Sequence, residues 1–424
     1  MLDRARARSR VWDLLVIGGG ATGLGIAVDA AARGHAVLLV ERDDFAKGTS
    51  SRSTKLIHGG VRYLQQGNVA LVMEALKERG ILRRNAPHLV HDLPFVVPSY
   101  AWWESPFYGI GLKLYDLLAG EHGFGASRHL DADEVVAAIP TIETEGLQGG
   151  TRYFDGQFDD ARLAVALART AAAQGAVLLN YCGAVALRKS DGQVCGAVLH
   201  DTEAGDEFAV QARVVINAAG PFCDAVRHLD DPAAPPLIAP SQGTHLVLPR
   251  EFLPNDVAIM VPHTSDSRVL FAIPWLGRVL VGTTDTAVAQ ATPEPVPQAA
   301  EIEFLLTTAN RYLARGASRA DILAVFAGIR PLVCGGGAST ASLSREHTLL
   351  IDPVSGLLTV AGGKWTTYRR MAEDAVDVAQ TLGRLPARQC RTATLAIDAG
   401  ATPAIAALSA ADAGLASRFT PACR

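Results

Sequence analysis

Three glycines near the start of the chain have the spacing of a site that binds a diphosphate. Gly18, Gly20 and Gly23 form G-x-G-x-x-G, and Glu41 follows further along. The first glycine permits a tight turn, the second lets a pyrophosphate approach the backbone, and the third lets a helix pack closely on a strand. A carboxylate at Glu41 can accept hydrogen bonds from a ribose 2′-hydroxyl and would repel a 2′-phosphate. The pattern therefore predicts a site for FAD or NAD rather than NADP.

These residues need a strand, a helix and a second strand to position them. Residues 14–17 and 36–40 are short apolar runs typical of strands that are buried on both faces. Between them, residues 22–33 have helical spacing, and Gly34 is a stop signal for a helix. A helix that begins at the glycines directs its N-terminal amides and its dipole toward the anion. Together these features make dinucleotide binding the leading interpretation.

Composition and charge narrow the class of protein. Of the 424 residues, 49% are hydrophobic and 19% are charged, which is typical of a globular protein. This length allows two domains, or one domain with a large insertion. Because the net charge is −4, we expect no nucleic-acid partner, and any basic site must be a local cluster. The sequence contains no run of about 18 apolar residues, so we expect no transmembrane helix.

The cysteines and histidines form no metal-binding or disulfide pattern. None of the six cysteines forms C-x-x-C or a zinc-ligand spacing, and a chain of this size needs no disulfide framework. We therefore expect reduced thiols in a cytoplasmic protein. His88 and His91 form H-x-x-H, but no carboxylate or cysteine pattern surrounds them, and we predict no metal site.

One stretch has features of both a protein core and a membrane interface. Residues 93–112 contain several prolines and gather the aromatic residues Tyr100, Trp102, Trp103, Phe107 and Tyr108. Aromatic side chains with polar tips suit either setting. The amphipathic segment at 110–118 could lie on a bilayer surface. Ordinary packing and peripheral membrane association both remain open.

The rest of the chain predicts an α/β fold. Residues 42–67 are rich in Ser, Thr, Gly and Lys, which suits a loop around a phosphate-bearing ligand. Prolines between 232 and 240 mark a boundary, after which strand-like runs up to residue 282 predict a largely antiparallel sheet. A last strand at 357–360 runs into Gly362, Gly363 and Lys364 and then into a helix, whose N-terminus could face another part of the cofactor.

We therefore predict a Rossmann-like, glutathione-reductase-like FAD-binding domain with an inserted, largely antiparallel substrate-binding sheet. The FAD-binding domain is expected in three pieces, 11–95, 150–235 and 322–385, and the substrate-binding or cap domain at 96–149 and 236–321. Residues 1–10 are predicted to be a disordered basic tail. Residues 386–424 are predicted to be a short C-terminal remnant, with poor order or one short helix.

Eight stretches together resemble the FAD-dependent glycerol-3-phosphate dehydrogenases, within the D-amino-acid-oxidase-like flavoproteins. They are GGGATGLGIAVDAAARG, FAKGTSSRSTKLIHGGVRYL, GPFCD, GTHLVL, VGTTDT, GIRPLV, SREH and GGKWTTYR. The stretch from Gly48 to Leu64 is the most specific of them. The resemblance runs from about residue 11 to residue 382, and we expect the residues that follow to lack most of the family's C-terminal helical domain.

The resemblance implies non-covalently bound FAD and the oxidation of sn-glycerol 3-phosphate to dihydroxyacetone phosphate. Hydride would pass from C2 to flavin N5, and electrons would then pass to a quinone in the membrane. The expected cofactor-binding residues are Gly18, Gly20, Thr22, Gly23, Glu41, Arg42, Thr49, Ser50, Ser51, Lys55, Leu56, His58, Gly59, Ala184, Ala219, Gly220, Gly362, Gly363, Lys364 and Thr366.

The resemblance also implies which residues meet the substrate. Arg62, Tyr63, Arg330 and Arg345 fall on the family's substrate positions, and the forked guanidinium group suits bidentate contact with a phosphate. Loss of hydride from C2 requires a base for the hydroxyl proton or a cation beside the alkoxide. The candidates for these catalytic roles are His58, His245, Arg330 and Lys364.

Two alternative functions remain open. One is a related flavin oxidase that uses oxygen and acts on glycerol phosphate or on a 2-hydroxy or 2-amino acid. The other is a truncated FAD-binding protein with little turnover. A homodimer and a peripheral position on the inner face of the cytoplasmic membrane are further expectations that these residues leave open.

Overall fold

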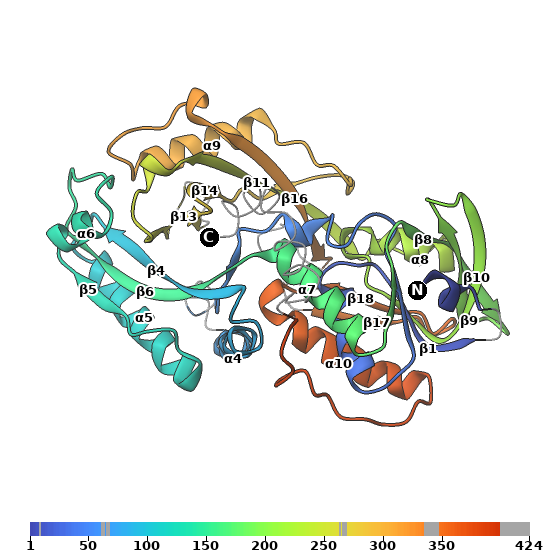
Figure 1. Ribbon diagram of the computed structural model, residues 1–424. Coiled ribbons are helices and arrows are strands. Elements are labelled where there is room, and N and C mark those ends of the chain that lie inside the picture. Colours follow the sequence, from blue (N-terminus) through green and yellow to red (C-terminus); the bar gives the residue numbers. More distant parts are fainter. Residues whose placement is uncertain are drawn as a thin grey trace, which may run out of the picture.

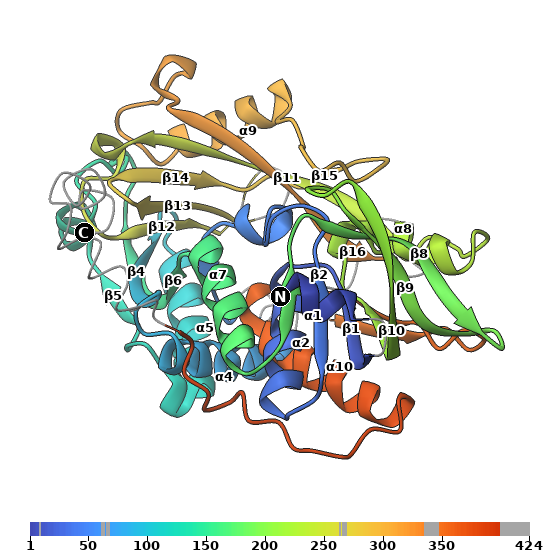
Figure 2. The same cartoon turned by 45° about the vertical axis from the view of Figure 1, so that its right-hand side comes forward.

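The computed structural model describes residues 1–7, 10–60, 64, 68–262, 264, 269–334 and 347–398, whose strands form two sheets (Figures 1 and 2). The first sheet contains β1 (Val11–Ile17), β2 (Val37–Val40), β7 (Val177–Leu179), β8 (Cys182–Ser190), β9 (Gln193–Asp201), β10 (Asp206–Asn217), β17 (His347–Ile351) and β18 (Leu358–Gly362). The second contains β3 (Leu56–Ile57), β4 (Val90–Ser99), β5 (Arg128–Leu130), β6 (Gly149–Phe158), β11 (Ile238–Pro249), β12 (Ala258–Val261), β13 (Leu270–Trp275), β14 (Arg278–Gly282), β15 (Thr286–Ala287) and β16 (Ala324–Val333). The α-helices are α1 (Leu2–Arg6), α2 (Ala21–Ala32), α4 (Val69–Asn85), α5 (Glu104–Ala119), α6 (Ala132–Ala138), α7 (Asp160–Ala173), α8 (Cys223–Asp230), α9 (Ala299–Asn310) and α10 (Tyr368–Leu382).

The first sheet is parallel through its centre and is covered on both faces. β1 pairs in parallel with β2 and β10, β2 pairs with β7, and β10 pairs with β18. On one face α2 packs between α7 and α10 (Figure 2). On the other face the β8–β9 hairpin, α1 and α8 enclose a core that contains Trp12. Burial on both faces explains why β2 is apolar at every position. The predicted α/β fold is confirmed.

The second sheet is largely antiparallel, with one parallel pair between β4 and β12. Its strands follow the two-residue alternation of a sheet that packs on both sides. In β4, Val96 faces the core beneath α6 and α9, whereas Phe95 and Val97 face the core beneath α5. The sheet therefore carries helices on both faces, and one face also borders the cavity described below.

Sheet membership differs from the predicted domain boundaries at four strands. β3, β4, β6 and β16 all pair within the second sheet. The predicted boundaries cut β4 between residues 95 and 96 and assigned β3, β6 and β16 largely or wholly to the FAD-binding domain. A strand's own residues do not identify its partner, because the pairing depends on segments far away in the sequence. The domain boundaries themselves stay a prediction.

Both ends of the described chain are more ordered than predicted. The tail at residues 1–10 was predicted to be disordered, but residues 2–6 form α1. Arg6 binds Asp201 and Asp206 at 3.0 and 2.6 Å, and Ala5 is buried, so charge pairing and packing order this segment. Residues 386–398 were predicted to be poorly ordered or a short helix, but they run along the surface as a strap without regular secondary structure (Figure 1). Residues 399–424 lie outside the described part.

The strap contacts four helices, α2, α4, α7 and α10. The Nη1 of Arg388 donates to the carbonyl oxygen of Arg33 at 2.7 Å, just after α2. Asn85 of α4 donates from Nδ2 to the carbonyl oxygen of Thr392 at 2.8 Å, and Asp398 pairs with Arg169 of α7 at 2.8 Å. The strap therefore joins these four helices.

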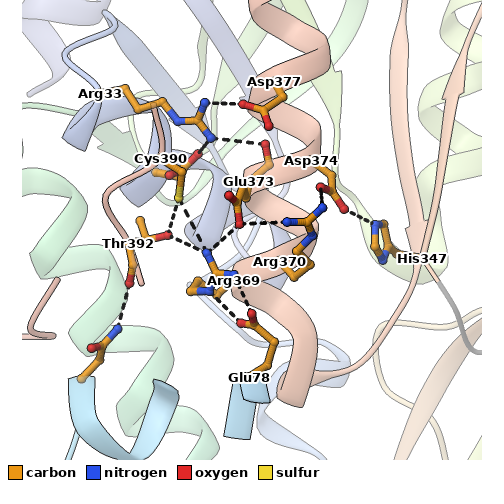
Figure 3. Close-up of polar contacts among 12 residues, drawn as sticks. Arg33, Glu78, His347, Arg369, Arg370, Glu373, Asp374, Asp377, Cys390 and Thr392 are labelled. Carbon is orange, nitrogen blue, oxygen red and sulfur yellow. Dashed lines mark hydrogen bonds and ion pairs between the residues drawn. The ribbon is translucent and has the colours of Figure 1, made fainter. Parts of the chain in front are cut away.

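A charge network lies beneath the strap (Figure 3). Arg369 of α10 and Glu78 of α4 are both buried. The Nε and Nη2 atoms of Arg369 donate to the two carboxylate oxygens of Glu78 at 2.7 and 2.5 Å. Arg369 also donates to Glu373 at 2.8 Å and to Thr392 of the strap at 3.4 Å. A bidentate pair of this kind fixes two helices in both distance and orientation. It therefore sets the position of α4 relative to α10.

Substitution of Glu78 tests this network. We expect Glu78→Gln to lower the free energy of unfolding by about 3 kcal/mol, because Arg369 would keep only part of its compensating charge. The measurement is urea unfolding of the FAD-loaded protein. The matched control is Glu303→Gln, which removes an exposed ion pair with Arg319. An exposed pair contributes at most about 1 kcal/mol, so equal effects in the two variants would contradict the assignment.

Candidate active site

The glycine turn after β1 brings backbone segments closer together than larger side chains allow. Gly18 has φ of +113°, and a Cβ there would lie 2.5 Å from the carbonyl oxygen of Ala218, just after β10. A Cβ on Gly23 would lie 1.9 Å from the carbonyl oxygen of Gly18. Glu41 follows β2, and its carboxylate accepts from the backbone nitrogen of Gly19 at 2.7 Å. The carboxylate therefore lies against the glycine turn, at the C-terminal edge of the parallel strands.

A cavity of about 1030 Å³ begins at this turn and extends between the two sheets. Most of the predicted cofactor-binding residues line it: Gly18, Gly20, Thr22, Glu41, Arg42, Thr49, Ser50, Leu56, His58, Ala219, Gly220, Gly362, Gly363, Lys364 and Thr366. His245 and Arg330, two of the predicted catalytic residues, line it as well. The tertiary structure thus brings segments from the start, middle and end of the described chain to one site.

Five predicted cofactor-binding residues, Gly23, Ser51, Lys55, Gly59 and Ala184, are not part of this lining. Gly23 packs under Gly18, as described above. Lys55 is buried and pairs with Asp160 at 2.7 Å. Gly59 is also buried, and its nitrogen donates to the Tyr115 hydroxyl at 2.8 Å. Gly23, Lys55 and Gly59 thus pack next to residues of the cavity wall, and contact of all five residues with a cofactor stays a prediction.

Hydrogen bonds connect the loop from Gly48 to His58 with three neighbouring segments. The Ser50 hydroxyl accepts from the backbone nitrogen of Ala21 at the start of α2, 2.9 Å away. The Thr49 hydroxyl donates to the carbonyl oxygen of Ile329 in β16 at 2.5 Å. Trp365, just after Lys364, donates from its indole nitrogen to the carbonyl oxygen of Ser50 at 2.8 Å. The loop is therefore fixed between the glycine turn, the second sheet and the Gly362–Lys364 turn.

Arg330 lies on β16 with its guanidinium group at the cavity wall. Its Nη2 donates to the Thr284 carbonyl oxygen at 2.8 Å and to the Thr283 hydroxyl at 3.0 Å. Its Nη1 lies 3.5 Å from a carboxylate oxygen of Asp285, which also accepts a hydrogen bond from Ser241. The guanidinium group is thus oriented by the residues at 283–285, between β14 and β15.

His245 is a buried histidine of β11 and is only 2% exposed. Its Nε2 lies 2.8 Å from the Thr54 hydroxyl, and its ring stacks on Phe326 with centroids 4.8 Å apart. Burial, followed by the charges of Arg330 and Lys55, lowers the pKa of His245 well below its usual value. The imidazole is therefore neutral at pH 7, and a neutral ring can accept a proton.

The remaining predicted catalytic and substrate-binding residues fall into two groups. His58 and Lys364 line the cavity, and the His58 carbonyl oxygen accepts from the Thr366 hydroxyl at 3.4 Å. Arg62, Tyr63 and Arg345 lie outside the described residues. Their roles stay predictions.

Several residues at the site were not predicted. Thr54, Thr283, Thr284 and Asp285 line the cavity and contact His245 or Arg330. The stretch VGTTDT was recognised as one of the family's motifs, but no role was assigned to its polar residues. Its run of hydroxyls and a carboxylate immediately after an apolar strand was the signal that could have identified them.

The cavity has the features that FAD requires. The glycine turn and the first amides of α2 suit a diphosphate, and the Glu41 carboxylate suits a ribose hydroxyl. A Cβ at Gly20 would approach the Ser50 hydroxyl to 3.1 Å, and one at Gly363 would lie 2.2 Å from the Met371 sulfur, so neither position leaves ordinary room for a side chain. The described residues bring together no group of three or more side chains that could hold a metal, and no described helix is long and apolar enough to cross a membrane.

This combination of a parallel nucleotide-binding sheet, a second sheet and a shared cavity defines a flavin-dependent oxidoreductase fold. The chain belongs to the family of FAD-dependent oxidoreductases, whose sequence model matches residues 13–369. FAD is accordingly its cofactor.

The individual relatives have more specific names than the family model. The chain is 48% identical over 398 residues to the mitochondrial glycerol-3-phosphate dehydrogenase SDP6 of Arabidopsis thaliana, covering 90% of this chain and 63% of that protein. It is 46% identical over 405 residues to the human mitochondrial glycerol-3-phosphate dehydrogenase, covering 92% of this chain and 55% of that protein. The chain thus spans between half and two thirds of the length of these relatives.

Solved structures show the same fold. The glycerol-3-phosphate dehydrogenase of Bacillus halodurans, complexed with FAD, is 31% identical and has a TM-score of 0.77, covering 99% of this chain and 75% of that one. The L-alpha-glycerophosphate oxidase of Mycoplasma pneumoniae, with FAD bound, has a TM-score of 0.70 at 15% identity, covering 92% of this chain and 99% of that one. The second likeness is evidence of fold alone.

The lowered pKa of His245 predicts how stability depends on pH. Below about pH 6.5 the unfolded chain binds a proton at this residue while the folded protein does not, so the free energy of unfolding falls as the pH falls. The contribution is at most about 1.4 kcal/mol per pH unit and vanishes above pH 7. Urea unfolding at pH 7.5 and 5.5 should give a smaller loss for His245→Gln than for the wild type. Equal losses would mean that His245 titrates normally in the folded state.

Proposed function

We propose that this protein oxidises sn-glycerol 3-phosphate to dihydroxyacetone phosphate and passes the electrons to a quinone. The single observation that carries the proposal is the placement of Arg330 and His245 on one wall of the FAD cavity, where a cation and a neutral base adjoin. The similarity to glycerol-3-phosphate dehydrogenases along most of the chain supports the choice of substrate.

The residues that line the cavity have separate roles in the proposed oxidation. The Arg330 guanidinium is oriented to attract the substrate's anionic oxygens and to stabilise negative charge that develops on its C2 oxygen. His245, neutral and buried, can accept the C2 hydroxyl proton, while the Thr54 hydroxyl holds the imidazole ring in place. When bound, FAD supplies the acceptor for the hydride from C2. Lys364, at the Gly362–Lys364 turn, adds positive charge to the same cavity.

The quinone acceptor is supported by the apolar arm of the cavity. Beyond His58 the lining becomes mostly apolar and reaches α5, where the wall includes Phe107, Ile110 and Leu114. An apolar arm suits a quinone ring better than it suits a phosphate. The same three side chains are exposed on the outer surface of α5, so the cavity reaches the surface here and a lipid-soluble acceptor could enter from that side.

We also propose that α5 contacts a membrane surface, placing the protein peripherally on the inner face of the cytoplasmic membrane. Tyr108 and Leu112 of α5 are buried against the second sheet, and Tyr115 is buried against α4. The opposite side carries an exposed stripe, with residues three or four positions apart: Trp103, Phe107, Ile110, Leu114 and Leu117. Trp102, at 82% exposure, lies next to this stripe. Such a stripe is typical of a helix that lies in a bilayer interface.

Reduction without oxygen tests the proposed reaction. We expect the purified yellow protein to lose its flavin absorbance when sn-glycerol 3-phosphate is added anaerobically, and a soluble quinone to restore it. Restoration by oxygen with stoichiometric peroxide would instead identify an oxidase. A colourless or unbleached protein would contradict the proposal and identify a flavin-binding protein with little turnover.

Arg330 and Lys364 should be separable from cofactor binding. We expect Arg330→Ala and Lys364→Ala each to reduce the rate of anaerobic bleaching by orders of magnitude, because each removes a charge that stabilises the transition state. The flavin absorbance per mole of protein should stay at the wild-type level. Wild-type bleaching rates in both variants would refute these roles.

The exposed stripe of α5 can be tested by liposome flotation. Ile110 and Leu117 are 72% and 77% exposed, so replacing both with Asp should leave the fold intact and abolish flotation. Leu276→Asp is the matched control, because Leu276 is 71% exposed but lies in the β13–β14 turn, outside the stripe. If the wild type does not float, or if the control loses flotation to the same extent, α5 is not the membrane contact.

A further inference from the structure

Glu301 is a buried carboxylate that lies behind the cavity wall and plays no part in the reaction described above. It belongs to α9, is 4% exposed, and accepts five hydrogen bonds. One carboxylate oxygen accepts from Gln242 Nε2 at 2.7 Å, from the Thr244 hydroxyl at 2.8 Å and from the Gln298 nitrogen at 2.9 Å. The other accepts from the hydroxyls of Thr284 and Thr286, each at 2.8 Å. All five donors are neutral.

A capping role for α9 explains only one of these bonds. Gln298 and Glu301 form the capping box at the start of the helix, which accounts for the bond from the Gln298 nitrogen. The other four donors belong to β11, to the residues that follow β14, and to β15. Glu301 therefore joins three segments of the second sheet that are separate in the sequence.

Two of the five residues that donate to Glu301, Gln242 and Thr284, also contact Arg330. Thr284 donates to Glu301 through its hydroxyl and accepts from Arg330 Nη2 through its carbonyl oxygen at 2.8 Å. Gln242 donates through its amide and accepts from Arg330 Nη1 through its carbonyl oxygen at 3.4 Å. Thr284 and Gln242 thus each link the Glu301 carboxylate directly to the Arg330 guanidinium group.

The ionised form of Glu301 fixes the direction of these bonds. Burial by itself would raise the pKa of Glu301, but the hydrogen bonds from Gln298 and the three threonines outweigh it and lower the pKa. An ionised carboxylate only accepts, so every hydroxyl must point its hydrogen at it. The Thr284 oxygen is then available to accept from the backbone nitrogen of Thr244 at 2.8 Å. This bond ties the residues after β14 to β11.

We propose that Glu301 is a positioning residue that sets the orientation of the Arg330 guanidinium for an anionic substrate. The substrate class rests on the proposed function, but the positioning does not. Gly243 supports this assignment, because a Cβ there would lie 2.3 Å from Arg330 Nη2. The guanidinium group therefore lies directly on the β11 backbone, beside Gln242, and a shift of β11 would move it.

The test measures anion binding to the FAD-loaded protein by calorimetry, with inorganic phosphate as the probe. Glu301→Gln replaces the carboxylate, which accepts hydrogen bonds through both oxygens, with an amide that accepts through one oxygen only. We expect this change to weaken phosphate binding by about tenfold to a hundredfold. In the Arg330→Ala background the same change should have little further effect, within about twofold. Glu301→Asp keeps the charge and should recover part of the affinity. Glu303→Gln, an exposed position on the same helix, is the control and should bind phosphate like the wild type.

Each outcome decides the assignment. A role limited to stability would lower the free energy of unfolding and leave phosphate affinity unchanged, and that result would overturn the proposal. An equal loss of affinity with and without Arg330 would also overturn it. If Glu301→Gln fails to retain FAD, Glu301→Asp is judged by the same two criteria. A wild type that binds phosphate but is not bleached by glycerol 3-phosphate would refute the proposed substrate and leave the role of Glu301 intact.

Discussion

The antiparallel pairing of β11 with β16 is the constraint on which the site depends. The ladder runs from Ile238 opposite Val333 to Val247 opposite Ala324, and it places His245 opposite Phe326. Because side chains alternate between the two faces of a strand, a slip of one residue would turn Arg330 away from the cavity. Gly243 provides the space into which the guanidinium group packs. The positions of the base and the cation are thus properties of one strand pair.

The loop from Gly48 to His58 transmits this arrangement to the nucleotide end of the cavity. It contacts α2 through Ser50, β16 through Thr49, and the residue after Lys364 through the Ser50 carbonyl oxygen. Thr54 of the same loop reaches His245. Networks of satisfied hydrogen bonds in a low-dielectric interior hold groups rigidly, since every broken bond leaves a buried polar atom without a partner. The loop therefore holds the glycine turn, β16, the Gly362–Lys364 turn and His245 in a fixed arrangement.

Helix α5 connects the cavity to the outer surface. Its buried side includes Tyr115, whose hydroxyl donates to Asp155 at 3.0 Å and accepts from the Gly59 nitrogen, next to His58. Arg79 pairs with the same Asp155 at 2.6 Å. The opposite side of the helix is the exposed apolar stripe. A helix that is apolar outside and hydrogen-bonded inside is well placed to connect a lipid-soluble acceptor with the flavin, which agrees with the proposed direction of electron flow.

The sequence by itself determined the glycine turn, the acid after β2 and the periods of most helices and strands, because these depend on neighbouring residues. Residues such as Gly18, Gly23 and Glu41 could be interpreted from their spacing alone. Only the tertiary structure decided that β4, β6 and β16 join the second sheet, that residues 386–398 form a strap, and that Glu301 lies behind Arg330. A period of two predicts a strand but not its partner. The pairing that assembles this site depends on contacts between segments far apart in the chain, which no local pattern encodes.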